Sequence, residues 1–86
     1  MEMAAAVKVL AYKGYGRNKV FCLLRDREVL RWNNQPFQRY VENGYFKTIE
    51  EIYEDSYGRT GVYYKTMISQ KGLDFIRKLI EEDVAA

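Results

Sequence analysis

The chain has no histidine, one cysteine, one proline and no long hydrophobic run. The missing histidine removes the commonest general base and the usual zinc ligand. The lone cysteine, Cys22, can form neither an internal disulfide nor a CxxC metal site, and its apolar neighbours predict a small buried residue. No apolar stretch approaches the ~20 residues that a membrane span needs, and the N-terminus has no signal-peptide pattern. We therefore expect a non-enzymatic cytoplasmic protein without metal, cofactor or membrane contact.

Two patterns that superficially suggest enzyme sites are better explained by structure. The acid pairs at 50–51 and 81–82 are adjacent in sequence, so their carboxylates do not converge on a substrate as glycosidase carboxylates do. The segment 14–19 lacks both the third glycine of a dinucleotide motif and the ending of a phosphate loop. It indicates a helix stop followed by a helix start, where Arg17 and Lys19 could hold a DNA phosphate.

Charge is unevenly distributed along the 86 residues, which are enough for one domain. Residues 8–47 carry nine Lys or Arg and three acids, a net charge of +6, whereas residues 48–86 carry five Lys or Arg and eight acids, a net −3. A basic half of this kind is where a phosphate backbone could be held. We expect the domain to span residues 3–82, with frayed ends at 1–2 and 83–86.

Hydrophobic periodicity and turn residues predict six elements. Helices are expected at 3–12, 19–28, 36–43 and 70–82, and strands at 46–55 and 62–68. Asn18 and Asn34 are the predicted N-caps of the second and third helices, and Ser69 caps the last one. The segment 46–55 also fits a helix, but the clear strand at 62–68 needs a partner, which favours a hairpin.

The order of three helices, a hairpin and a final helix indicates an α+β fold. The simplest packing is a trihelical unit followed by a two-stranded wing, with the C-terminal helix against the first helix. This arrangement is a winged helix-turn-helix, in which the third helix would be the recognition helix. Phe37, Tyr40 and Val41 have the spacing of its buried stripe.

The exposed side of this third helix carries the strongest functional signal. Asn and Gln can pair with adenine and Arg with guanine in the major groove, and helix-turn-helix proteins place such residues at the start of the recognition helix. The candidate DNA contacts are Arg17, Asn18, Lys19, Asn34, Gln35, Gln38, Arg39, Lys47, Tyr57 and Arg59. The alternative is that polar residues simply occupy the exposed side of a small helix. The acidic run 50–55 would also repel a duplex that it faced.

Several blocks of the chain resemble, in order, the C-terminal domain of phage antirepressors, the KilA-C family. The blocks lie at 16–21, 23–26, 34–41, 44–47, 65–66 and 70–76. The resemblance implies a phage or prophage transcription regulator that binds double-stranded DNA. Full-length members of this family act against phage repressors, so the resemblance also implies a repressor protein as a partner. The domain usually lies at the C-terminus of longer phage proteins.

Two functions therefore stay open. The leading one is duplex binding, with helix 36–43 in the major groove and the wing turn 56–61 on the backbone or minor groove. The other is a protein-interaction module that binds a phage repressor or forms a homodimer. Tyr63 and Met67 alternate on one strand face, opposite Tyr64, so a wing that the last helix leaves uncovered would expose an adhesive aromatic surface.

Overall fold

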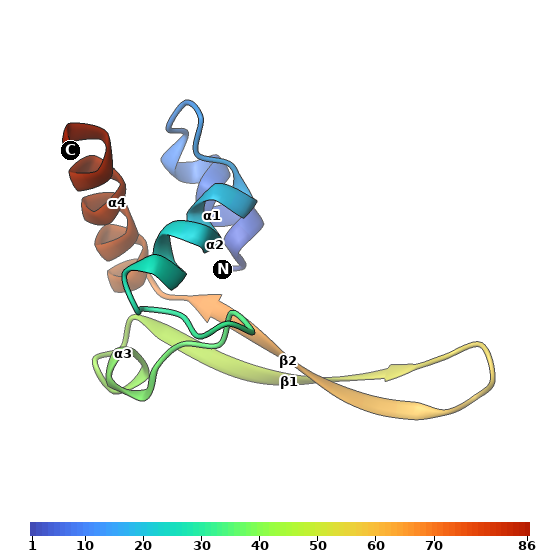
Figure 1. Ribbon diagram of the computed structural model, residues 1–86. Helices are drawn as coiled ribbons and strands as arrows, with labels where there is room; N and C mark the ends of the chain where they lie inside the picture. Colours follow the sequence, from blue (N-terminus) through green and yellow to red (C-terminus); the bar gives the residue numbers. More distant parts are fainter.

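The computed structural model describes all 86 residues and shows a group of helices from which a long hairpin projects (Figure 1). The elements are α1 (Met3–Leu10), α2 (Arg17–Asp26), α3 (Gln38–Glu42), β1 (Phe46–Glu54), β2 (Thr60–Ile68) and α4 (Gln70–Ala85). We call residues 46–68 the arm and the remainder the body. The predicted α+β class and the predicted order of elements are confirmed. None of the helices combines the length and apolarity needed to cross a membrane.

The hydrophobic core lies in the body and at the root of the arm. Its thirteen residues are Met3, Ala6, Val20, Leu23, Leu24, Val29, Leu30, Phe46, Ile68, Leu73, Ile76, Leu79 and Ile80. Phe46 and Ile68, which pair with each other, are the only buried residues of the arm. The molecule measures 49 × 28 × 22 Å, and the arm supplies most of the length (Figure 1).

The first two helices differ from their predicted bounds because of backbone conformation. The first helix ends at Leu10 rather than at residue 12, since Ala11 adopts a left-handed conformation with φ 55°. The second begins at Arg17 after Gly16, so the prediction that Asn18 caps it is wrong. It ends at Asp26, two residues before Glu28, which has a positive φ of 58°.

The third helix is much shorter than predicted, with only five residues instead of 36–43. Asn34 has a φ of 65° and lies in a turn, so it does not cap the helix. Pro36 forms a β-bridge with Leu30, which holds the preceding chain away from a helical path. The predicted buried stripe is only partly present, because Tyr40 and Val41 are half-buried, with Tyr40 packed against the core, whereas Phe37, the N-cap residue, is exposed.

The hairpin and the last helix agree closely with the sequence prediction. β1 and β2 pair antiparallel from Phe46↔Ile68 to Glu54↔Thr60. The Ser69 hydroxyl accepts a 3.0 Å hydrogen bond from the Gly72 amide, so the predicted cap of α4 is confirmed.

Both ends of the chain make hydrogen bonds to the rest of the protein. α4 continues to Ala85, three residues past its predicted end at 82. Near this end the Tyr12 hydroxyl donates to Glu81 at 2.7 Å, and the Tyr15 hydroxyl donates to Asp83. Met1 exchanges two backbone hydrogen bonds with Ile68, of 2.8 and 2.6 Å. Met1 and Asp83, which lie in the segments expected to fray, are thus hydrogen-bonded to the rest of the protein.

Cys22 also departs from its prediction, because it is exposed on α2. Its sulfur accepts a 3.3 Å contact from the Arg25 guanidinium, one turn further along the helix. Of the apolar run 20–24, therefore, only Val20, Leu23 and Leu24 are buried, on one side of the helix.

Candidate nucleic-acid interface around helix α3

Helix α3 is positioned by the first turn of α4. The Ser69 amide donates to the Tyr45 carbonyl at 3.1 Å, and the Ser69 hydroxyl donates to the Gly44 carbonyl at 2.6 Å. Gly72 packs directly on this carbonyl layer, since a Cβ at that position would collide with the backbone oxygen of Tyr45. The segment just after α3 is therefore locked to α4 by backbone contacts.

An aromatic stack continues this contact to the side chains. Phe75 of α4 stacks on both Tyr40 and Tyr45, with ring centroids 5.4 and 4.7 Å away, and the two tyrosine rings are 6.1 Å from each other. The Arg39 guanidinium lies 4.9 Å from the Tyr40 ring, and the Lys71 ammonium lies 5.1 Å from the Tyr45 ring. Cation–π contacts of this kind hold a charge close to a rigid platform while leaving it accessible to solvent. The stack thus holds two cations from distant parts of the sequence against its tyrosine rings.

We call the exposed side chains Arg31, Gln38, Arg39, Lys71 and Lys78 the α3 surface. Arg31 lies 5.6 Å from the ring of Phe37, which is next to Gln38 and Arg39, whereas Lys71 and Lys78 share a second groove with Asp74, which pairs with Arg77. None of the four cations of the α3 surface forms an ion pair within 4.0 Å. Gln38 and Arg39 line an open groove of about 320 Å³ together with Glu28 and Phe37. The surface therefore combines unpaired positive charge with two exposed side chains that can donate hydrogen bonds.

Arg17 and Asn34, two of the predicted contacts, lie in a separate groove of about 360 Å³, which also includes Tyr64, Lys65 and Thr66 of β2. Asn34 is held there, because its side-chain oxygen accepts from Arg25 and its carbonyl accepts from Thr66 at 3.0 Å.

The other predicted residues of the body are distributed more widely. Lys19 lies 5.8 Å from the Tyr15 ring, and Asn18 is exposed beside it on α2. Gln35 is half-buried, and its backbone carbonyl accepts from the Arg31 amide at 2.8 Å. Lys47 is exposed at the start of β1. Only Gln38 and Arg39 belong to the α3 surface.

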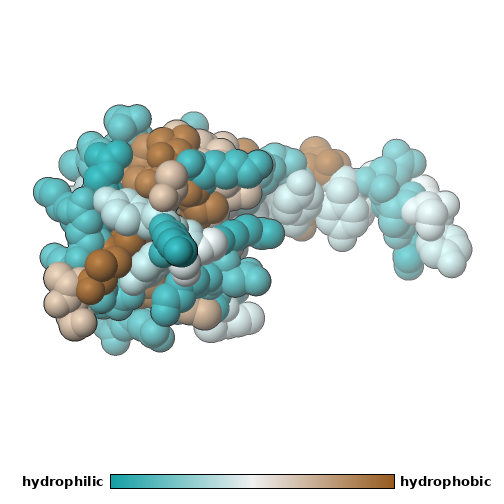
Figure 2. Space-filling model, turned by 90° about the horizontal axis from the view of Figure 1, so that it is seen from above, coloured by the Kyte–Doolittle hydropathy of each residue, from teal (hydrophilic) through white to brown (hydrophobic).

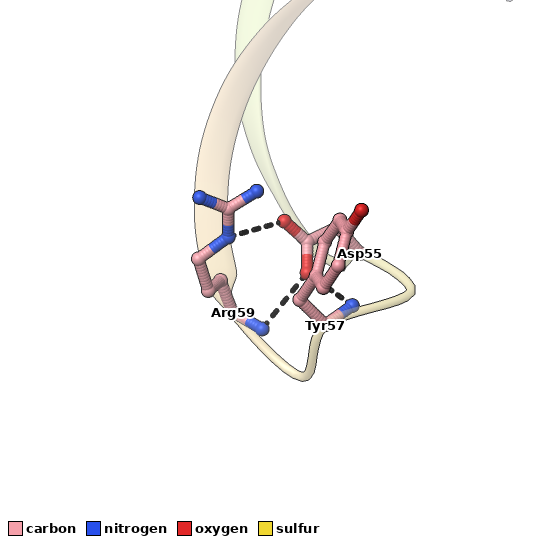
Figure 3. A network of polar contacts seen from close by, with 3 residues as sticks. All are labelled: Asp55, Tyr57 and Arg59. Atoms are coloured by element: carbon pink, nitrogen blue, oxygen red, sulfur yellow. Dashed lines mark hydrogen bonds and ion pairs between the residues drawn. The ribbon is translucent and has the colours of Figure 1, made fainter.

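The last two predicted contacts, Tyr57 and Arg59, lie at the tip of the arm. The Asp55 carboxylate accepts from the backbone amides of both residues at 2.9 Å and from the Arg59 side chain at 2.8 Å (Figure 3). The amide of Arg59, followed by that of Tyr57 and by the Arg59 side chain, lowers the pKa of Asp55. Arg59 is therefore a partnered cation, although Tyr57 beside it is 82% exposed.

The predicted contacts did not include Arg31, Lys71 and Lys78 of the α3 surface, nor Trp32 in the turn before α3. Lys71 and Lys78 are seven residues apart on α4, a spacing that places them on one helix face and that the sequence alone could have indicated. Trp32 is 87% exposed in the turn before α3, and no local pattern distinguishes it from a core tryptophan. Large exposed aromatic residues of this type are common in binding surfaces.

Comparison with known proteins agrees with the resemblance in the sequence. The family model of the phage antirepressor protein KilAC domain matches residues 1–83. The chain is 34% identical over 85 residues to the "SPbeta prophage-derived putative antirepressor protein YoqD" of Bacillus subtilis (strain 168). This match covers 95% of the chain but only 32% of the relative, so the chain spans about a third of that protein's length. No solved structure matches the chain. The chain therefore belongs to the phage antirepressor KilAC domain family, which is regulatory rather than catalytic.

Proposed function

We propose that this domain binds duplex DNA through the α3 surface, as part of a phage regulator with a winged helix-turn-helix type of fold. The observation that carries the proposal is the arrangement of two exposed, unpaired side chains, Gln38 and Arg39, at the start of α3, flanked by the unpaired cations Arg31, Lys71 and Lys78. Gln and Arg are suited to adenine and guanine, and the flanking cations to phosphates.

The shortness of α3 limits which residues can read bases. A helix of five residues presents little more than one turn, so only its first residues can reach into a groove while the rest meets the body. Helix-turn-helix proteins contact base edges with the N-terminal residues of the recognition helix, and this matches the position of Gln38 and Arg39. Glu28 and Glu42 lie close by and would oppose phosphates, so the lysines of α4 are needed to make this surface attractive to DNA.

The wing contact receives less support than the helix contact. Nine-residue strands make an arm about 30 Å long, so its tip lies far from α3. The one basic residue of the wing turn 56–61, Arg59, is paired with Asp55, and β1 carries Glu50, Glu51 and Glu54. We therefore assign the DNA contact to the body.

A salt-dependent anisotropy titration tests the proposal. A duplex selected from a random pool and a scrambled duplex serve as ligands. Arg39→Ala is expected to weaken binding to the selected duplex by about 1–3 kcal/mol and to change binding to the scrambled one little. Lys71→Ala is expected to weaken both equally and to reduce the log–log salt slope by about 0.9.

Lys13→Ala is the matched control for Lys71→Ala. It removes the same charge from the exposed loop between α1 and α2, outside the α3 surface. Binding that does not respond to salt, or equal losses for Lys13→Ala and Lys71→Ala, would show that the α3 surface is not the DNA contact.

The arm favours the second candidate function, a contact with another protein. Ile52, Tyr57 and Tyr64 are 79%, 82% and 55% exposed, and of these only Tyr64 lines a groove with residues of the body. A phage repressor is one partner of this kind, in line with the name of the relative. Under this alternative, Tyr64→Ser would abolish capture of a purified cognate repressor, whereas Arg39→Ala would leave capture unchanged. No capture by the unaltered domain, or capture that survives Tyr64→Ser, would rule out the arm as the repressor contact.

A further inference from the structure

The two strands of the arm have edges of opposite character. β1 carries Lys47, Glu50, Glu51 and Glu54, so its free edge is lined with charges. β2 carries a single charged residue, Lys65, close to the root, and the run from Thr60 to Tyr64 contains no charge and no proline. Charges and proline are the usual means by which proteins keep exposed strand edges from pairing. The edge of β1 is protected in this way, and the edge of β2 is not.

The root of the β2 edge is covered by the N-terminal residues. Met1 exchanges backbone hydrogen bonds with Ile68, and Glu2 forms an ion pair with Lys65. Nothing comparable lies beside residues 60–64, and the arm is seen there as a narrow projection (Figure 2). The open part of the edge is therefore this five-residue run.

The hydrogen-bond pattern shows which backbone groups face outward. Antiparallel strands alternate between residues whose amide and carbonyl groups point to the partner strand and residues whose groups point away. Ile68 uses its groups outward, toward Met1, and Asp55 donates inward to Arg59 at the other end of the arm. Both observations place the amides and carbonyls of Thr60, Val62 and Tyr64 on the open side.

We propose that the open edge of β2 pairs with the same edge of a second copy of this chain, antiparallel and centred on Val62. In this register Thr60 lies opposite Tyr64 of the second copy, and Val62 lies opposite its own equivalent, so the outward groups of both copies meet. The turn of the second copy would then lie opposite Thr66 of the first copy. It would not reach Ile68, whose backbone groups are bonded to Met1. The result is one four-stranded sheet with two-fold symmetry.

Electrostatics and stability favour a second copy as the occupant. The run 60–64 contains no charged side chain, so none of its residues would meet a like charge across the two-fold axis. Just outside the run, Arg59 would lie opposite Lys65 of the second copy, but both charges are already paired, with Asp55 and with Glu2 and Glu51 respectively. Pairing of two β1 edges centred on Glu50, Glu51 or Ile52 would instead place carboxylates opposite carboxylates, which is destabilising. A two-stranded ribbon without a core is also only marginally stable in water, whereas three or more strands support one another.

The test is the oligomeric state of the 86-residue chain in the absence of DNA, measured by sedimentation between about 10 µM and about 1 mM. The wild-type chain is expected to show a concentration-dependent monomer–dimer equilibrium. Val62→Lys would place two ammonium groups opposite each other and is expected to weaken the dimer about tenfold or more. A chain that is monomeric throughout this range overturns the proposal.

Ile52→Lys is the matched control, because Ile52 is the cross-strand partner of Val62 on the same face but belongs to β1. It is expected to change the dimer constant less than about twofold. Equal weakening by both variants would mean that the arms stack through their faces, and it would overturn edge pairing. Circular dichroism confirms that each variant is folded.

Cross-linking provides a second measurement that does not depend on added charge. In a Cys22→Ser background, Val62→Cys is expected to form a disulfide-linked dimer on mild oxidation, and Ile52→Cys is not. Equal cross-linking of both would again overturn the register. Since Gln38 and Arg39 are unchanged in all these variants, failure of the dimer and failure of DNA binding are separate outcomes.

Discussion

The body and the arm are stabilised by different forces. The body contains a continuous apolar core built from three of its helices and the loop after α2. Beyond its root the arm buries no side chain, and it depends on its ladder and on exposed contacts such as the 2.7 Å hydrogen bond from the Tyr63 hydroxyl to Glu51. Contacts of the second kind contribute little in water, because solvent competes for them. We therefore expect the arm to open more readily than the body.

The largest expected difference between the body and the arm is the change in the free energy of unfolding when a single isoleucine is replaced by alanine. Ile76 is fully buried in α4, and Ile52 is 79% exposed on the arm. Ile76→Ala should lower the free energy of unfolding by about 2–5 kcal/mol, since it loses burial and leaves a cavity. Ile52→Ala should change it by less than about 0.5 kcal/mol. Urea denaturation of the dilute chain measures both values.

A large effect of Ile52→Ala would contradict this view of an uncovered arm. If that effect appeared only at high protein concentration, Ile52 would be covered by a second copy. If it were present at every concentration, the arm would fold back on the body in solution.

A smaller difference is expected at two glycines that both lie close to another residue. At Gly72 a Cβ would meet the backbone oxygen of Tyr45, which cannot move without displacing α3. At Gly61 it would meet the ring of Tyr53, a half-exposed side chain that can rotate away. Gly72→Ala is expected to cost about 1–3 kcal/mol from the collision, offset in part by the ~0.5–1 kcal/mol that alanine adds in a helix.

Thermal unfolding of Gly72→Ala and Gly61→Ala checks this expectation. Gly61→Ala should shift the midpoint by no more than a few degrees. Equal shifts would show that Tyr53 is held as firmly as the body, and an unchanged midpoint for Gly72→Ala would show that α3 and α4 are not locked together.

The sequence predicted those features that depend on neighbours in the chain. The hairpin and the Ser69 cap were found because alternation, turn residues and a capping hydroxyl act within a few residues. The length of α3 was missed because its start is set by the Leu30–Pro36 bridge and the positive φ of Asn34. These features depend on how the loop after α2 packs against the arm, which local periodicity does not encode.

The candidate site was only partly predictable for the same reason. Gln38 and Arg39 were identified from residue type and from their place at the start of a helix. Lys71 joins them through the stack of Tyr40, Phe75 and Tyr45 and through a 2.8 Å hydrogen bond to the Asn43 carbonyl, contacts that bring together two helices about thirty residues apart in sequence. The charge difference between β1 and β2, in contrast, can be predicted from the sequence alone, because it follows directly from the residues assigned to each strand.

The smallest predicted effect is the response of the arm to acid. Hydrogen bonds from the backbone amides lower the pKa of Asp55, and the Tyr63 hydroxyl followed by Lys65 lowers the pKa of Glu51. A carboxylate with a lowered pKa in the folded state adds stability above its ordinary pKa, which is 3.8 for Asp and 4.5 for Glu. This stability is lost as the pH falls through the folded value. The arm should therefore loosen in acid, below these ordinary values, before the body does.

Asp55→Asn isolates the contribution of the turn to this acid response. The amide oxygen of asparagine can still accept from the Tyr57 and Arg59 amides, but the ion pair with the Arg59 side chain is lost. Amide exchange at the tip of the variant should thus be somewhat faster at neutral pH and should change less on acidification than in the wild-type chain. Glu54→Gln is the control, because it removes the same charge from the adjacent residue, whose carboxylate makes no ion pair. If both variants keep the full acid response of the wild-type chain, Asp55 does not hold the tip, and the acid sensitivity of the arm originates at Glu51.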